Sequence, residues 1–165
     1  MPGPTAFYGF GFSVKADTPG IVVLDYRYTR GDRVVKGLPA ERRNDPSFQG
    51  TYETSITGQL LIGDKLYVKW KDKSTGVIRE ADIDLSGRLP SSLQDKNIHF
   101  VIGNETVNVY VASIKGVITT GCLQIQKERA LSPNNPDLIA RSLYCGKQLD
   151  KIYPEMKNLN NYKHD

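Results

Sequence analysis

The stretch that most constrains the fold spans residues 58–111, where apolar and polar side chains alternate with a period of two. Apolar side chains stand at Leu66, Val68 and Trp70, and at alternate positions over residues 77–85. This spacing places apolar groups on one face of a strand and water-compatible groups on the other. Two of the strands in this stretch are therefore predicted at residues 66–71 and 77–85.

Turn-forming residues separate these strands and the next two along the chain. The segment DKSTG at 72–76 supplies the first turn, and Gly103 with Asn104 supplies another between residues 98–102 and 107–111. Such residues favour tight connections between antiparallel strands. The whole stretch predicts an antiparallel meander with one wet face.

Strands are also predicted before this meander. Residues 7–14 place aromatic side chains at alternate positions, with Gly9 and Gly11 on the opposite face, which indicates close approach of another chain segment. Residues 21–29 alternate in the same way, so the two segments are expected to form an N-terminal hairpin. A further strand is expected over residues 48–56.

The C-terminal third gives weaker signals. Residues 117–125 have β-branched character and predict a strand, whereas the Asn-Pro-Asp segment starting at Asn135 is typical of a helix start. Residues 1–5 and 156–165 are polar ends that are expected to be flexible.

These patterns together predict a mainly β protein. The expected architecture is an antiparallel two-sheet sandwich, or one strongly curved sheet, with a short C-terminal helix. The length of 165 residues suits a single domain over residues 1–165.

Composition excludes several classes of protein. Hydrophobic residues make up 39% and charged residues 24%, which is ordinary for a globular domain. The net charge of +4 comes from scattered basic residues, so no nucleic-acid partner is expected. No apolar run is long enough to cross a bilayer, and no secretory signal is visible at the N-terminus. A native signal or lipoprotein segment is therefore taken to be absent from this chain.

The two cysteines carry information about the compartment. Cys122 and Cys145 form no CxxC motif, and no histidine stands at a metal-ligand spacing from them. They are expected to form a disulfide in an exported protein, closing a loop worth about 3 kcal/mol. The alternative is a pair of buried reduced thiols.

Catalytic signals are sparse, so the protein is not expected to be an enzyme. His99 is expected to be a surface or half-buried strand residue, and His164 lies in the tail. Asp82 and Asp84 share a strand face, but neighbouring lysines favour solvated ion pairs over an acid–base pair. No catalytic residue, metal site or cofactor is predicted.

A cluster of aromatic and basic residues favours a binding function. Tyrosine and arginine dominate protein–protein hot spots, and they gather at the end of the strand that leads into the long polar segment 30–47. This segment is expected to be a loop, either functional or simply solvated. The residues predicted to contact a partner are Tyr26, Tyr28, Arg30, Arg33, Arg42 and Arg43.

Several motifs between residues 7 and 111 resemble a known family. They are YGFGFSV, a tryptophan strand followed by W-x-D-x-x-T-G, and the segment D-L-x-x-R-L-P. In this chain the two spaced motifs correspond to Trp70, Asp72, Thr75, Gly76, Asp84, Leu85, Arg88, Leu89 and Pro90. The pattern is similar to small bacterial periplasmic proteins and lipoproteins often encoded beside type VI secretion effectors.

The resemblance implies an immunity protein that binds and occludes a toxic type VI effector, most directly a lipase or phospholipase. It also implies a periplasmic location and a lipid anchor at the native N-terminus. The family conveys no contact residues, so the tyrosines and arginines named above remain predictions from the sequence itself.

Two other functions remain open at this point. A periplasmic inhibitor or binding module for another target, such as a lysozyme, would share the β architecture and the disulfide. A small hydrolase with an unrecognised site predicts a deep pocket holding perturbed acids or His99. An immunity protein instead predicts a flat or protruding binding surface.

Overall fold

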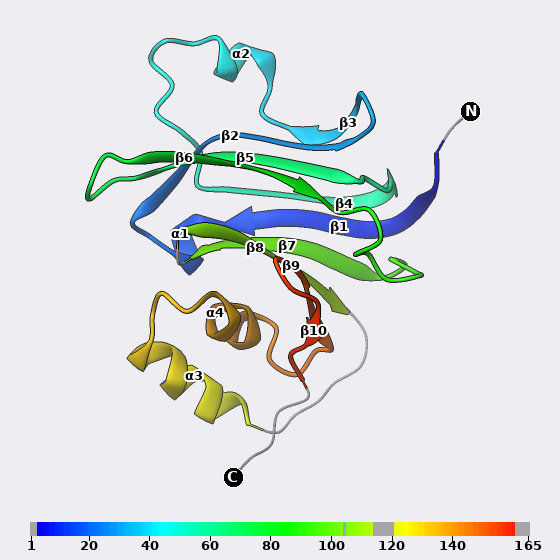
Figure 1. Cartoon of the computed structure of the whole chain (residues 1–165), viewed down its shortest axis with the longest axis vertical. Coiled ribbons are helices and arrows are strands. Elements are labelled where there is room, and N and C mark those ends of the chain that lie inside the picture. Colours follow the sequence, from blue (N-terminus) through cyan, green and yellow to red (C-terminus); the bar gives the residue numbers. More distant parts are fainter. Residues whose placement is uncertain (1–2, 104, 114–120, 161–165) are drawn as a thin grey trace.

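The computed structural model describes residues 3–103, 105–113 and 121–160. Within these ranges the strands form two sheets with the orders β10-β9-β8-β7-β1-β4 and β3-β2-β5-β6. The sheets stack face to face, α4 packs against the outer face of the larger sheet, and α3 packs on α4 (Figure 1). The expectation of a mainly β, two-sheet fold is confirmed.

The larger sheet joins strands from both ends of the chain. β1 lies in its interior, antiparallel to β4 and parallel to β7, and the other pairs are antiparallel. Its strands are β1 (Thr5–Ser13), β4 (Glu53–Leu61), β7 (Lys96–Gly103), β8 (Thr106–Ser113), β9 (Leu149–Tyr153) and β10 (Lys157–Asn158).

The smaller sheet is antiparallel throughout. Its strands are β2 (Ile21–Arg30), β3 (Arg33–Gly37), β5 (Lys65–Asp72) and β6 (Ile78–Asp84). Helical segments in the described residues are α1 (Val14–Asp17), α2 (Ala40–Arg43), α3 (Cys122–Leu131) and α4 (Pro136–Leu143).

The predicted meander is divided between the two sheets. Its first hairpin is β5–β6 in the smaller sheet, and its second is β7–β8 in the larger sheet. The connection between them contains Leu85 and Leu93, which are 0% and 2% exposed in the shared core. Because these leucines pack in the shared core, the chain passes from one sheet to the other between β6 and β7. The alternating pattern alone did not indicate this crossing.

The predicted N-terminal hairpin is wrong, because β1 and β2 belong to different sheets. α1 turns the chain from one sheet to the other, and the aromatic faces then meet across the sandwich. Phe10 stacks on Tyr28 with ring centroids 4.6 Å apart, and Phe12 meets Tyr26 edge-on at 5.1 Å. Aromatic pairs of this kind stabilise a core beyond simple area burial.

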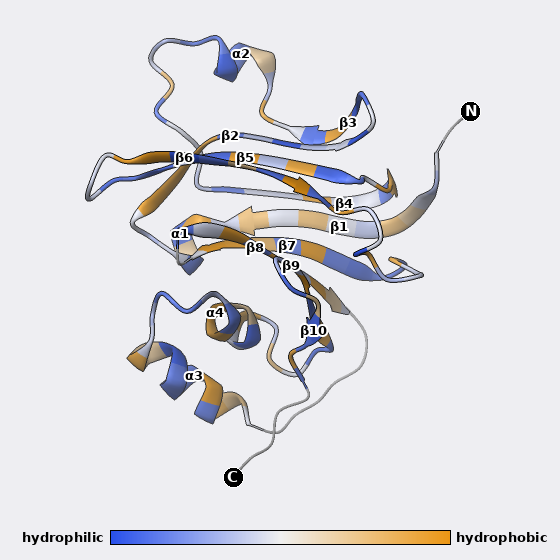
Figure 2. Cartoon of the chain, in the orientation of Figure 1, coloured by the Kyte–Doolittle hydropathy of each residue, from blue (hydrophilic) through white to orange (hydrophobic). Residues whose placement is uncertain are grey.

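The larger sheet is buried on both faces at its centre. One face of β7 contributes Phe100 to the core between the sheets, and the other contributes Val101 to a second apolar cluster. That second cluster includes Ile139 and Ala140 of α4, each 0% exposed. The expected wet face is therefore absent from β7 and β8, where residues 98–103 and 107–112 are all buried, with a few polar positions among the apolar ones (Figure 2).

In the C-terminal region the structure differs from the predicted strand and confirms the predicted helix start. The predicted strand 117–125 ends inside α3, whereas residues 114–120 lie outside the described residues. The helix start at Asn135 is confirmed, because its Oδ1 accepts hydrogen bonds from the backbone N–H groups of Asp137 and Leu138 at 3.0 and 3.2 Å.

Two further expectations concern where the strand before the meander begins and whether the C-terminal end is flexible. The strand expected over residues 48–56 forms later, as β4. Within the segment 156–165 that was expected to be flexible, β10 pairs with β9 and Leu159 is 9% exposed in the second cluster.

Cys122 and Cys145 form the expected disulfide, with a Cα–Cα distance of 5.7 Å. It joins the first residue of α3 to the turn after α4. A disulfide is consistent with an oxidising compartment.

Candidate functional site

The two tyrosines predicted to contact a partner lie in the core between the sheets. Tyr26 and Tyr28 are 3% and 0% exposed. The Tyr28 hydroxyl lies 2.8 Å from the Tyr8 hydroxyl and accepts a hydrogen bond from the Gly63 N–H at 2.9 Å. Burial raises the pKa of Tyr28. Both rings are therefore buried in this fold and present no exposed surface to a partner.

The predicted arginines separate into two groups. Arg30 is half-buried and donates a hydrogen bond to the Ile62 carbonyl at 3.0 Å, which fixes its side chain at the end of β2. Arg33, Arg42 and Arg43 are exposed. The exposed arginines all lie in one segment that projects from the smaller sheet.

We call this projecting segment, residues 31–47, the arm. The sequence predicts an irregular loop here, but the arm contains β3 and α2 (Figure 1). β3 pairs with β2, which gives the first half of the arm backbone hydrogen bonds. The sequence pattern did not reveal this regular structure because β3 has five residues and α2 has four.

Core contacts and an ion pair hold the base of the arm. Leu38 is 6% exposed, and its N–H donates to the Tyr26 carbonyl at 3.2 Å. The Arg43 guanidinium donates to the Leu38 carbonyl at 3.2 Å and to Asp25 Oδ1 at 3.3 Å. The arm is thus anchored at both its middle and its second half, while Arg33 and Arg42 remain exposed.

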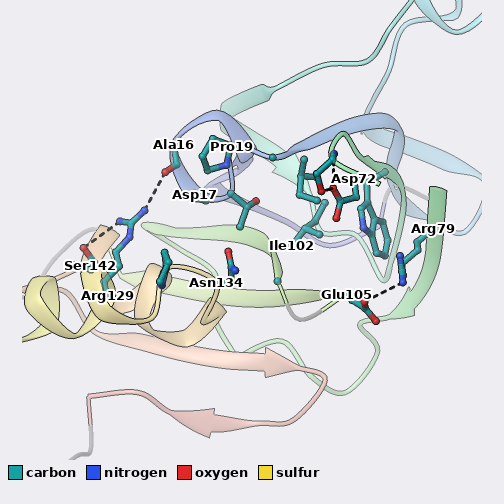
Figure 3. Close-up of a pocket in the computed structure, with 18 of the residues that line it drawn as sticks. Ala16, Asp17, Pro19, Asp72, Arg79, Ile102, Glu105, Arg129, Asn134 and Ser142 are labelled. Carbon is teal, nitrogen blue, oxygen red and sulfur yellow. Dashed lines mark hydrogen bonds and ion pairs between the residues drawn. The ribbon is translucent and has the colours of Figure 1, made fainter. Parts of the chain in front are cut away.

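A cleft of about 870 Å³ opens elsewhere, where one end of the sandwich meets the helical layer (Figure 3). Its walls come from the α1–β2 turn, the β5–β6 hairpin, the β7–β8 turn, and α3 with the segment up to α4. These elements are far apart in the sequence, and only the folded chain brings them together. The sequence predicted none of these residues as a site.

A buried histidine–aspartate contact lies beside the cleft. His99 Nε2 and Asp17 Oδ2 are 2.9 Å apart, with the two residues 7% and 4% exposed. The His99 ring meets the Tyr144 ring edge-on at 5.6 Å. The expectation of a surface or half-buried histidine is wrong, because the helical layer covers the face of β7 that carries it.

The pair joins α1 to β7, and only Asp17 lines the cleft. His99 is not among the lining residues, so its ring does not face a molecule bound in the cleft. The lining also includes Asp72, whose pKa is lowered by hydrogen bonds from Ser74. A carboxyl group that stays ionised at neutral pH is poorly suited to act as a general acid.

Charges of both signs line the cleft. Arg79 Nη2 and Glu105 Oε1 pair at 3.2 Å on the sandwich side. On the helical side, the Arg129 guanidinium donates to the Ser142 hydroxyl at 3.3 Å and to the Ala16 carbonyl at 3.1 Å (Figure 3). Arg129 thereby ties α3 to both α4 and the α1–β2 turn.

The described part of the chain contains no group of three or more metal-ligating side chains suited to holding a metal ion. No helix within it has the length and apolar character needed to span a membrane.

Comparison with protein-family models, with curated proteins and with solved structures gives no match in any of the three.

Proposed function

We propose that this protein acts by binding and occluding another protein, and that its partner is a toxic type VI secretion effector. The proposal makes it an immunity protein, as the sequence resemblance implies. Its partner would most directly be a lipase or phospholipase. The single structural observation that carries the proposal is the anchored, projecting arm.

The arm has the properties of a pre-organised contact surface. Its exposed side chains include Arg33, Arg42 and the apolar Val34, which is 59% exposed. Arginine is enriched among residues that dominate binding energy. Because the base of the arm is already held by Leu38 and Arg43, binding would cost little further backbone ordering.

The structure narrows the set of contact residues in this proposal. Arg33 and Arg42 are the primary contacts, because both side chains are exposed, one on β3 and the other on α2. Arg43 has a second role in holding the arm against Asp25, and Arg30 holds the end of β2. Tyr26 and Tyr28 support the arm from inside the core.

The proposed location is the periplasm, with a lipid anchor at the native N-terminus. The Cys122–Cys145 disulfide supports an oxidising compartment. The lipid anchor rests on the sequence resemblance.

Calorimetric titration against the purified product of the adjacent gene tests this function. We expect one-to-one binding in the nanomolar range, with an interface that buries about 1,200–2,000 Å² in total. A parallel titration against lysozyme separates an effector inhibitor from a lysozyme inhibitor. Absence of binding to a demonstrably folded effector would refute the proposal for that pair.

Substitution in the arm then locates the interface. We expect Arg33→Ala and Arg42→Ala each to weaken binding about tenfold, as is typical of a hot-spot arginine. Lys127→Ala removes an exposed cation from α3, away from the arm, and should leave the affinity unchanged. Equal losses in all three variants would indicate a general charge effect, and no loss in either arginine variant would remove the arm from the interface.

A further inference from the structure

The cleft beside α1 is a second site that the arm does not use. It lies between the sandwich and the helical layer, whereas the arm projects from the smaller sheet (Figures 1 and 3). Because no residue of the arm lines the cleft, a ligand bound there is independent of the arm's partner.

Two buried polar atoms at the cleft have no hydrogen-bond partner among the described residues. They are Asp17 Oδ1 and Thr18 Oγ1, in residues that are 4% and 7% exposed. Both residues line the cleft. Buried polar atoms are nearly always paired, and an unpaired one destabilises the fold. Both atoms have almost no accessible surface, so a ligand that supplies hydroxyl or N–H donors reaches them once the two side chains turn towards the cleft.

The helical side of the cleft offers complementary groups close to these acceptors. The Arg129 guanidinium donates to the neutral oxygens of Ser142 and Ala16, and it carries five N–H donors in total. Gln126 and Asn134 add amide groups that both donate and accept. Because Ala16 immediately precedes Asp17, a ligand in the cleft meets donors and acceptors next to each other.

The alternation of charge in the cleft disfavours a ligand with a net charge. The carboxylates of Asp17, Asp72 and Glu105 share the lining with the guanidiniums of Arg79 and Arg129. An anion near Arg129 would also face Asp17, and a cation near Glu105 would face Arg79. Because like charges repel at short range, a charged ligand in the cleft would be repelled by one of these neighbouring groups, whereas a neutral ligand would not.

The lining also contains the apolar residues Ile21, Ile102 and Trp70. The volume of about 870 Å³ lies within the range of about 300–1,000 Å³ that is usual for small-molecule sites. A neutral molecule with many hydroxyl groups and apolar C–H faces matches these walls, because each hydroxyl both donates and accepts. Planar carboxylate, amide and guanidinium groups can each bridge neighbouring hydroxyls.

We propose that the cleft binds a short neutral carbohydrate, with Asp17 and Thr18 accepting hydrogen bonds from its hydroxyls and Arg129 donating to them.

Nuclear magnetic resonance tests the site directly. The ¹⁵N-labelled, oxidised protein is titrated with maltose, cellobiose and diacetylchitobiose, and with glutamate and glucose 6-phosphate as charged probes. We expect saturable shifts for at least one disaccharide, confined to the α1–β2 turn, the β7–β8 turn and α3. No saturable shift with any disaccharide at millimolar concentration, or stronger binding of a charged probe at the cleft, would overturn the proposal.

Thr18→Val separates a ligand contact from a purely structural role. Valine preserves the branched shape and removes the unpaired hydroxyl, so we expect a higher thermal midpoint for the free protein and at least tenfold weaker carbohydrate binding. A lower midpoint with unchanged affinity would mean that the hydroxyl serves the fold alone, and would contradict the proposal.

A matched pair on α3 provides a second test that does not disturb the core. Gln126 lines the cleft, whereas Gln124 on the same helix is exposed and does not. We expect Gln126→Ala to weaken carbohydrate binding severalfold and Gln124→Ala to leave it unchanged. Equal affinities in the two variants would place the carbohydrate outside the cleft.

Discussion

The hydroxyl of Tyr28 joins three parts of the chain in the core. It lies against the Tyr8 hydroxyl and accepts from the Gly63 N–H, and Gly63 itself sits directly against the Tyr28 ring. Tyr28→Phe would leave the buried Gly63 N–H without its acceptor. We expect a loss of about 1–3 kcal/mol in the free energy of unfolding, measured by chemical denaturation.

The matching control is Tyr52→Phe, because Tyr52 is 42% exposed. Its hydroxyl is open to water, so the change in unfolding free energy should be close to zero. If the two variants lost equal stability, the Tyr28 hydroxyl would not be a specific anchor. Partner affinity should be unchanged in Tyr28→Phe, since the ring is buried.

Asp137 centres a network of charges between α4 and the end of the larger sheet. Lys151, which is 5% exposed, lies 2.8 Å from Asp137 Oδ1, and the Tyr110 hydroxyl donates to the same oxygen at 2.7 Å. Burial alone would raise the pKa of Asp137, but hydrogen bonds from Lys151, Lys157 and Tyr110 lower it. The ionised carboxylate is thus the form that the fold stabilises.

A lowered pKa in the folded state gives a definite pH dependence. The stabilisation is complete above the unfolded pKa of about 3.9 and is lost as pH falls through the lower folded value. We expect Asp137→Asn to cost on the order of 2 kcal/mol at neutral pH, because it leaves Lys151 buried with only Glu155 nearby. Denaturation curves over a pH series should show the difference from the unaltered protein shrinking in acid.

Asp150, on β9, supplies a control because its pKa is shifted in the opposite direction. Burial raises the pKa of Asp150, so its ionised form is disfavoured by the fold at neutral pH. Asp150→Asn should therefore not reduce stability at neutral pH. A pH-independent loss in Asp137→Asn would instead indicate that packing, and not charge, explains its effect.

Single residues also show where sequence reasoning succeeds. The cap at Asn135 was predictable because capping is local, and the side chain bonds backbone groups two and three positions ahead. The burial of Tyr28 was not, because tyrosine is compatible with a core or a surface, and its hydroxyl partners lie 20 and 35 positions away. The chemistry of the side chain was clear, but its environment depended on the fold.

At the scale of elements, α3 depends on few contacts. Ile125 is its only buried residue, Leu123 and Leu131 are 75% and 86% exposed, and Gly121 supplies no side-chain cap. The disulfide holds its first turn, and Arg129 holds its last. α4, in contrast, buries Ile139 and Ala140 completely.

Reduction should therefore loosen α3 before any other element of the helical layer. We expect the double variant Cys122→Ser with Cys145→Ser to lose amide protection in α3 while α4 and the sandwich keep theirs. Hydrogen exchange with mass spectrometry measures this. The loss in global stability should be about 3 kcal/mol or less, the value for closing a loop of this size. Uniform loss of protection would show that the disulfide stabilises the whole fold.

Element types were more predictable than element partners. The alternation that indicated β5 and β6 also reports their shared apolar face, and turn residues at 72–76 make them neighbours. β1 and β2 have equally clear alternation but are separated by α1, whose four residues carry little helical signal. Pairing of β1 with β4 and β7 depends on contacts between distant residues, which periodicity does not encode.

At the scale of the whole molecule, the larger sheet belongs to two apolar clusters at once. One face of β7 and β8 packs against the smaller sheet, and the other packs against α4. Loss of either cluster would expose an apolar face of these shared strands, so we expect the oxidised protein to unfold in a single transition.

Two signals can check this cooperativity. Trp70 is the single tryptophan of the chain and is 3% exposed in the sandwich, so its fluorescence reports the sandwich core. Far-UV circular dichroism also reports the helices. Coincident denaturation midpoints would support one cooperative unit, and an earlier dichroism change would indicate a helical layer that unfolds independently.

The two candidate sites differ in how far the sequence alone could predict them. The arm is one continuous segment, so its arginines could be selected from the sequence. The cleft combines Asp17, Arg79 and Arg129 from separate elements, and none of them belongs to a motif. The His99–Asp17 contact beside it joins residues 82 positions apart. Only a correct topology could have placed these side chains together.

The parallel pairing of β1 with β7 also sets an order of events during synthesis. β1 is made before its second neighbour, β7, which ends at Gly103. At about 5–20 residues per second, β1 waits several seconds for that neighbour. Distant pairings of this kind slow folding, because a long loop must close before they form. The nascent chain thus cannot pair both edges of β1 until β7 has been translated.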